Sequence, residues 1–180
     1  LIFAEPSPIR EGPPFEVLFM VNSSHHLAAP VVEELLKIEG IRVTVTVGRD
    51  AGLGRTLALL AKAKGKEIEI FGWTPGIPDL IRRSHLLISK AGGATVQEAL
   101  AARTPMLVTQ VVPGQEEGNA RLLTESGAGE LATTPAAIAE AVSRTFADGA
   151  AIYLKRYAAT ASLSHPDSAR NTATFLESIL

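Results

Sequence analysis

The sequence predicts an α/β protein of the Rossmann-like, doubly wound type, in which helices cover both faces of a parallel six-stranded sheet. Segments with strand and helix patterns alternate six times along the chain, which is typical of parallel sheets with right-handed crossovers. The strand-like segments, such as 15–21, are nearly continuously apolar, as expected of strands covered on both faces. The 180 residues, 46% hydrophobic and 20% charged, suit one domain with a substantial core.

The first half of the chain opens with a proline-rich segment and then alternates between strands and helices. Residues 1–14 contain four prolines, which disfavour helices and central strands, so we expect an interdomain linker. The domain itself is expected to cover residues 15–180. Polar residues and glycines separate the apolar segments that follow. These segments predict strands over 15–21, 41–47 and 67–71, and helices over 27–38, 55–64 and 79–83.

The second half continues the alternation around a Gly-Gly pair. The apolar residues 86–88 lead to glycines at 92–93, after which apolar side chains recur at helical spacing. A second unit of the same design follows, with a strand over 105–108, a loop over 111–114 and a helix that begins at Gln115. The remaining segments predict a strand over 127–131, a helix over 133–147 and two helices from 150 to the end, interrupted at 164–167.

Composition excludes several classes of function. A net charge of −2 gives no electrostatic reason to expect a nucleic-acid partner. The lack of cysteine excludes disulfides, thiolate catalysis and cysteine metal sites, and it is compatible with a reducing compartment. No uninterrupted apolar run is long enough to span a bilayer, and the N-terminus has no signal-peptide pattern. Because the chain begins with Leu1 rather than Met, we expect a fragment of a longer protein.

The turn at 92–93 is the candidate binding site. Glycines carry no Cβ, so a ligand can approach the backbone closely, and the free N–H groups and dipole of the following helix attract an anion such as a diphosphate. Thr95 adds a hydroxyl donor, and Glu98, one turn along the same face, can accept hydrogen bonds from sugar hydroxyls. Taken alone, a glycine pair between strand and helix is more often ordinary turn chemistry than a binding site. The two successive units favour the binding site.

Two stretches carry a resemblance to a known enzyme family. They are Ser89-Lys-Ala-Gly-Gly-Ala-Thr-Val-Gln-Glu-Ala and the more specific Pro113-Gly-Gln-Glu-Glu-Gly-Asn-Ala. Here the chain resembles the donor-binding, C-terminal half of two-domain nucleotide-sugar glycosyltransferases of the GT-B type. It looks most like the family 28-like group of monogalactosyl- and glucosyl-diacylglycerol synthases and the N-acetylglucosaminyltransferase that makes lipid II from lipid I. Fainter similarity extends from about Phe15 to the C-terminus.

The resemblance implies the donor-binding domain of an inverting, metal-independent enzyme that moves a hexose from a UDP-sugar to a lipid or other acceptor hydroxyl. The UDP-sugar is then a co-substrate, and neither a cofactor nor a metal ion is expected, in keeping with the lack of an Asp-x-Asp motif. In the resembling enzymes the acceptor groove and the general base come from an N-terminal domain, which we expect to lie outside this chain. We therefore assign no catalytic residue and expect the fragment alone to transfer sugar poorly.

The same resemblance indicates partners and location. Besides the UDP-sugar, the expected partner is an N-terminal acceptor domain or a separate partner subunit, with a lipid acceptor at the membrane surface as a further option. The expected localisation is cytoplasmic, with peripheral association at the inner face of the membrane as a further option.

The resemblance also implies which residues contact the nucleotide-sugar. Glu98 is expected to hold the ribose hydroxyls, the start of the helix at 115 to hold hydroxyls of the transferred sugar, and Lys90 to approach a phosphate. The loop after the third strand is expected to contact the uracil ring. The loop after the first strand reads Asn22-Ser-Ser-His-His, where the family usually has glycines, which is a departure. The full expected set is Ser23, Ser24, Gly48, Arg49, Trp73, Thr74, Ile77, Lys90, Gly92, Gly93, Ala94, Thr95, Glu98, Gln115, Glu116 and Asn119.

Alternatives remain open from the sequence. Trp73 either stacks on a base or packs between helix and sheet. Lys90 is either a phosphate ligand or a solvated residue at a strand end, and Glu98 and Glu116 are either ligands or surface helix residues. The chain as a whole is alternatively a stand-alone nucleotide-sugar subunit that needs a separate partner, a UDP-sugar 2-epimerase-like domain, or a non-enzymatic α/β binding domain.

Overall fold

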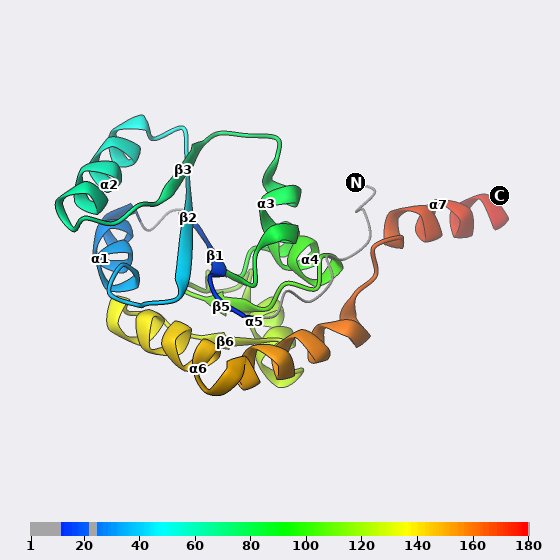
Figure 1. Ribbon diagram of the computed structural model, residues 1–180. Helices are drawn as coiled ribbons and strands as arrows, with labels where there is room; N and C mark the ends of the chain where they lie inside the picture. Colours follow the sequence, from blue (N-terminus) through cyan, green and yellow to red (C-terminus); the bar gives the residue numbers. More distant parts are fainter. Residues whose placement is uncertain (1–11, 22–24, 180) are drawn as a thin grey trace.

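The computed structural model describes residues 12–21 and 25–179, and it confirms the predicted fold class. Six parallel strands form one sheet in the order β3-β2-β1-β4-β5-β6 (Figure 1). Most of the strands are buried and rich in Val, Ile, Leu and Phe, as expected of a sheet covered on both faces. The strands are β1 (Phe15–Met20), β2 (Ile41–Gly48), β3 (Glu69–Gly72), β4 (Leu86–Ser89), β5 (Met106–Val108) and β6 (Gly129–Leu131).

Helices pack on both faces of this sheet, as predicted. One face is covered by α1, α2 and the first part of α6, and the other by α3, α4 and α5 (Figure 1). Alternate residues of the central strands point to opposite faces of the sheet. Val17 therefore packs with α1, α2 and α6, whereas Leu18 packs with α3, α4 and α5. The helices are α1 (His25–Leu35), α2 (Ala51–Ala63), α3 (Ile77–Arg83), α4 (Gly93–Ala101), α5 (Glu117–Glu125), α6 (Pro135–Thr160) and α7 (Ser168–Ser178).

The strand order places a topological switch point between β1 and β4. From β1 the chain proceeds to β2 and β3 in one direction, whereas from β4 it proceeds to β5 and β6 in the other. The helices that follow these two neighbouring strands, α1 and α4, cover opposite faces of the sheet. Open α/β sheets bind their ligands at the carboxyl edge beside such a point. The turn at 90–92 follows β4 and therefore lies at this edge.

Several helix starts differ from the prediction, and α1 and α3 each begin two residues early, at His25 and Ile77. Helix α2 begins at Ala51 rather than at residue 55, because the Asp50 side chain accepts a 2.9 Å hydrogen bond from the N–H of Leu53 and caps the helix. Helix α5 begins at Glu117 rather than at Gln115. The carbonyl of Val112 accepts hydrogen bonds from the N–H groups of residues 115 and 116, which closes a turn ahead of the helix.

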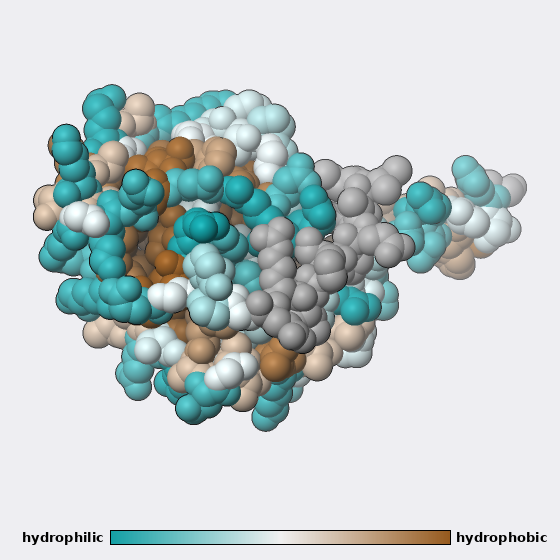
Figure 2. All heavy atoms as spheres, in the orientation of Figure 1, coloured by the Kyte–Doolittle hydropathy of each residue, from teal (hydrophilic) through white to brown (hydrophobic). Residues whose placement is uncertain are grey.

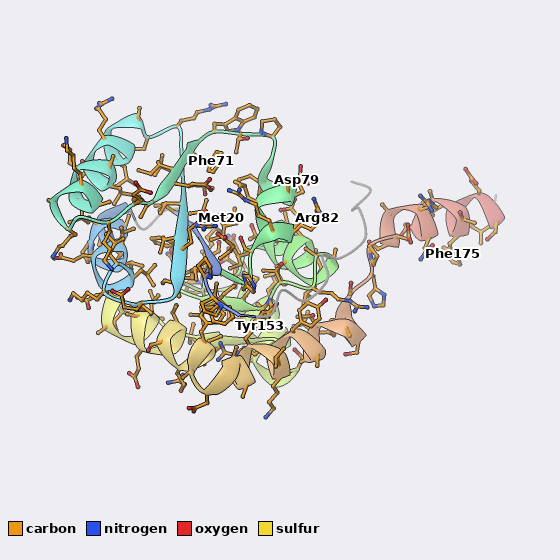
Figure 3. All side chains as sticks on the ribbon, in the orientation of Figure 1. Met20, Phe71, Asp79, Arg82, Tyr153 and Phe175 are labelled. Carbon is orange, nitrogen blue, oxygen red and sulfur yellow. The ribbon has the colours of Figure 1, made fainter. Side chains whose placement is uncertain are left out.

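The C-terminal part departs from the compact body. The backbone of α6 is not helical over residues 147–150, where Asp148, Gly149 and Ala150 have positive φ, so the predicted break after 147 is confirmed. Beyond it, α7 projects away from the sheet (Figures 1 and 2), and Phe175 lies on this projecting helix (Figure 3). In the body, the face seen in Figure 2 has hydrophilic side chains around recessed apolar ones. None of the helices in the described part of the chain has the length and apolar content needed to cross a membrane.

Candidate functional site

The turn from β4 into α4 presents unpaired backbone donors. Gly92 is the N-cap residue and provides no side-chain cap, and its carbonyl accepts a 2.9 Å hydrogen bond from the N–H of Val96. Within the described residues, no acceptor pairs with the N–H groups of Gly93, Ala94 and Thr95. Gly93 and Ala94 are exposed and Thr95 is half-buried, so this helix terminus is open to solvent at the carboxyl edge of the sheet. Free N–H groups and the helix dipole make this terminus favourable for an anion.

The loop from β5 into α5 contacts this turn through a buried acid. Glu116 is only 5% exposed, and its Oε1 forms an ion pair with the ammonium of Lys90. Its Oε2 accepts a 3.0 Å hydrogen bond from the N–H of Val112 at the start of the same loop. The next acid, Glu117, is exposed and accepts a 2.6 Å hydrogen bond from the N–H of Gly114, which lowers the pKa of Glu117.

A second contact joins the same two units. The side-chain amide of Asn119 donates a 3.0 Å hydrogen bond to the carbonyl of Ala91. A Cβ added to Gly93 would lie 3.6 Å from Asn119 Nδ2, so the start of α4 and the first turn of α5 lie close together. Gln115 is exposed beside them. Of the predicted residues, the structure thus brings Lys90, the glycines at 92–93, Glu116 and Asn119 together.

Glu98 lies on α4, one turn beyond the exposed N–H groups. It is half-buried, and within the described residues its carboxylate has neither a hydrogen-bond donor nor an ion-pair partner. Burial disfavours its charged form and raises the pKa of Glu98 above the ordinary value. An unpaired carboxylate of this kind can accept hydrogen bonds from ligand hydroxyls.

The loops after β2 and β3 lie side by side at the same edge. Gly48 pairs in register with Gly72, and a Cβ on Gly72 would lie 3.4 Å from the carbonyl oxygen of Gly48. Trp73 is 69% exposed, so the structure excludes the alternative in which it packs between helix and sheet. Phe71, near the end of β3, and Met20, at the end of β1, both pack against the buried residues of the α3–α4–α5 layer (Figure 3).

The remaining predicted residues are distributed as follows. Arg49 is exposed in the turn after β2. The hydroxyl oxygen of Thr74 accepts a 3.0 Å hydrogen bond from the N–H of Gly76, so it stabilises the loop before α3. Ile77 packs against the buried residues of the α3–α4–α5 layer, which leaves mainly its backbone for a ligand. Ser23 and Ser24 lie outside the described residues.

Sequence reasoning missed the two contacts that join the units. The pairing of Lys90 with Glu116 spans 26 residues, and that of Asn119 with Ala91 spans 28. The available signal was that opposite charges follow two strands whose carboxyl ends meet at one sheet edge. An apolar hollow beside Lys90, lined by residues of β1, α1, α6 and the loop after β5, was missed as well. The described residues contain no group of three or more His, Cys, Asp or Glu side chains placed to hold a metal ion.

Comparisons with known proteins place this geometry in a family. Residues 26–170 match the model of the glycosyltransferase family 28 C-terminal domain. A processive diacylglycerol beta-glucosyltransferase of Bacillus subtilis is 30% identical over 140 residues, which cover 76% of this chain but 37% of that protein. The chain therefore spans well under half the length of this relative.

Solved structures share the fold at low sequence identity. The chain superimposes on MurG of Acinetobacter baumannii with a TM-score of 0.74 and 16% identity, covering 92% of this chain and 50% of that one. It superimposes on Anabaena HepE, solved in complex with UDP and glucose, with a TM-score of 0.63 and 16% identity, covering 92% and 48%. With the match over residues 26–170, the chain belongs to the glycosyltransferase family 28 C-terminal domain family and has the fold of GT-B C-terminal halves.

Proposed function

We propose that this chain is the donor-binding domain of an inverting glycosyltransferase that moves a hexose from a UDP-sugar to a lipid or other acceptor hydroxyl without a metal ion. The observation that carries the proposal is the set of N–H groups at Gly93, Ala94 and Thr95, which have no partner in the described part of the chain and lie at the switch point of the sheet beside the Lys90 ammonium. Membership of the glycosyltransferase family supports it.

In the proposed reaction the acceptor oxygen attacks the anomeric carbon of the sugar as the bond from that carbon to the diphosphate breaks. The UDP leaves with the bonding electron pair, and the acceptor proton goes to a base outside this chain. The first-turn N–H groups of α4 stabilise the negative charge that grows on the diphosphate. One well-placed donor of this kind contributes about 3 kcal/mol to transition-state stabilisation.

The rest of the donor is bound by the residues around this terminus. Glu98 accepts hydrogen bonds from the ribose hydroxyls, for which its free, half-buried carboxylate is suited. Trp73 and the exposed backbone after β3 lie against the uracil ring, and the exposure of Trp73 supports this role. Gln115, which is exposed beside Asn119, contacts hydroxyls of the transferred sugar. Ser23, Ser24, Gly48 and Arg49 complete the donor cleft.

The acceptor is proposed to be a lipid, because the similar Bacillus proteins are named for diacylglycerol. Its binding groove and the general base are proposed to lie in an N-terminal domain or partner subunit. The part of those relatives that this chain does not match is long enough to contain such a domain. Such an enzyme would work in the cytoplasm and at the inner face of the membrane.

Calorimetry tests the proposal directly. UDP and UDP-glucose are expected to bind the wild-type chain, and Glu98→Ala is expected to weaken both by about tenfold because the ribose is common to them. Gln115→Ala is expected to weaken UDP-glucose more than UDP. A thermal-shift panel with UDP-galactose and UDP-N-acetylglucosamine then ranks the sugars, since a ligand that binds only the folded chain raises its melting temperature. A wild-type chain that binds none of these ligands would refute the proposal.

A further inference from the structure

The ion pair between Lys90 and Glu116 combines a buried acid with a partly exposed base. Glu116 is 5% exposed as a residue, whereas the Lys90 side chain remains 31% exposed. Charged side chains are rarely buried unless they are paired, because desolvation of the charge is costly. The burial of Glu116 therefore depends on the ammonium of Lys90.

Both carboxylate oxygens of Glu116 already have protein partners. Oε1 pairs with Lys90, and Oε2 accepts from the N–H of Val112. Because this side chain is buried and each of its oxygens already has a partner, it is poorly placed to accept hydrogen bonds from the hydroxyls of a sugar bound at this edge of the sheet. Gln115, the preceding residue, is exposed and has a free side-chain amide among the described residues, so it suits that contact better.

The ammonium of Lys90 lies against the start of α4. A Cβ added to Gly92 would lie 3.5 Å from Lys90 Nζ and 3.7 Å from Glu116 Oε1. The ammonium thus lies beside the same helix terminus that carries the unpaired N–H groups. It has three donors, and Glu116 is its only acceptor among the described residues, so the other donors can reach phosphate oxygens.

We propose that Glu116 is a positioning residue, which acts on the donor diphosphate by holding the ammonium of Lys90 beside Gly92 and does not itself bind the sugar. This inference rests on the proposed function. A lysine is a point charge on a flexible four-carbon stem, so its position over a phosphate must be fixed by another group. Glu116 fixes it, and through Val112 it also ties the loop before α5 to the turn after β4.

The test is a double-mutant cycle in the present chain, read by calorimetry with UDP and UDP-glucose. Glu116→Gln keeps the size of the side chain and an acceptor for the Val112 N–H but removes the charge that holds Lys90. We expect it to weaken UDP and UDP-glucose by the same factor, about fivefold, and Lys90→Met to do so at least as strongly. In the Lys90→Met background, Glu116→Gln is expected to have no further effect, because positioning through Lys90 is then impossible.

Glu117→Gln is the matched control. It makes the same charge change one residue away, in an exposed side chain that bonds Gly114 rather than a lysine, and it is expected to leave both affinities within about twofold. Circular dichroism checks that each variant is folded. If Glu116→Gln does not fold, Glu116→Asp takes its place, because it keeps the charge but draws it one methylene away from Lys90, and equal weakening of UDP and UDP-glucose is again the expected result.

Three results would overturn the inference. If Glu116→Gln weakens binding of UDP-glucose but not of UDP, Glu116 is a sugar ligand. The same result for Lys90→Met would make Lys90 a sugar ligand. Additive losses in the double variant would show that Glu116 acts independently of Lys90. Unchanged or tighter binding of UDP by Glu116→Gln would show that the position of Lys90 does not depend on it. If the wild-type chain has no affinity for UDP, the proposed function is wrong as well. That result differs from the three above, because in each of them the wild-type chain binds UDP.

Discussion

The side-chain amide of Asn119, in the first turn of α5, donates a 3.0 Å hydrogen bond to the carbonyl of Ala91, in the turn between β4 and α4. This bond spans 28 residues and connects the two consecutive strand–helix units that form the candidate site. The turn that presents the free N–H groups is thus held from the neighbouring unit, and its geometry does not depend on the glycines alone.

Asn119→Ala is expected to lower the free energy of unfolding by about 1 kcal/mol, because the carbonyl of Ala91 loses its partner. It is also expected to weaken UDP-glucose binding several-fold, since the turn is less well fixed. Urea denaturation and calorimetry measure the two effects. Asn171→Ala, on the exposed surface of α7, is the control and should change neither. Equal stability of the two variants would contradict the role given to this bond.

Gly93→Ala separates the fold from the binding site. The added Cβ would lie at an ordinary 3.6 Å from Asn119 Nδ2, and the φ of Gly93 is not positive, so the fold is expected to tolerate the change. We expect stability within about 0.5 kcal/mol of wild type, but UDP affinity at least about tenfold lower, because the methyl group occupies the approach to the helix terminus.

Gly118→Ala provides the control for this substitution. It makes the same change in α5, where a Cβ would meet nothing within 4 Å, and UDP affinity should be unaffected. If Gly93→Ala binds UDP as tightly as Gly118→Ala does, the diphosphate does not lie at the start of α4.

Donor binding is expected to depend on pH through Glu98. Burial raises the pKa of Glu98 in the free protein, whereas ribose hydroxyls donating to its carboxylate favour the ionised form. Binding therefore releases a proton, and the affinity for UDP-glucose should be constant above the raised pKa and fall as pH decreases through it. Calorimetry from neutral pH down to the ordinary carboxyl pKa of 4.5 measures this dependence. UDP-glucose is the appropriate ligand because its phosphates, both esterified, do not titrate in this range.

Glu98→Gln should bind UDP-glucose more weakly than the wild-type chain, and its affinity should no longer fall with decreasing pH through titration of this side chain. If the variant and the wild-type chain show the same pH profile, Glu98 does not contact the donor.

A buried arginine in α6, away from the candidate site, is expected to contribute to the free energy of unfolding. Arg156, after the bend in α6, is 8% exposed, pairs with Glu130 of β6 and donates a 3.0 Å hydrogen bond to Thr145 Oγ1. Arg156→Met leaves Glu130 without its most buried partner and is expected to cost about 2–4 kcal/mol of unfolding free energy. Arg144 pairs with the same carboxylate but is exposed, so Arg144→Met should cost less than about 1 kcal/mol. Similar losses for the two variants in urea denaturation would contradict this assignment.

The sequence was sufficient to predict the features that depend on local patterns. Local patterns, apolar or β-branched in most of the strands, predicted all six strands, and glycines and prolines predicted the loops between them, because strand and turn signals are carried by neighbouring residues. The start of α2 was missed because Gly52 and Gly54 weaken the helical pattern, although Asp50 caps the helix. The start of α5 was missed because a turn closed by the Val112 carbonyl precedes it.

The arrangement within the site could be predicted only in part. The glycine turn and Glu98 were predicted as site residues from their spacing along one strand and one helix, and their role in binding stays a prediction. The ion pair of Lys90 with Glu116 and the hydrogen bond of Asn119 to Ala91 depend on which strands are neighbours in the sheet. Local sequence patterns do not indicate that strand order. The exposure of Trp73 likewise depends on the tertiary structure, so the sequence left both of its alternatives open.

The donor-binding role proposed for this chain depends on binding of the UDP-sugar diphosphate by the N–H groups of Gly93, Ala94 and Thr95. Nuclear magnetic resonance of the ¹⁵N-labelled chain tests it most directly, by titration with UDP and, separately, with uridine, which has no phosphate. UDP is predicted to shift these three amide proton resonances downfield as hydrogen bonds form, whereas uridine is predicted to leave them in place. If UDP binds and saturates while these three resonances stay unchanged, or shift equally with uridine, the diphosphate is bound elsewhere and the account is wrong.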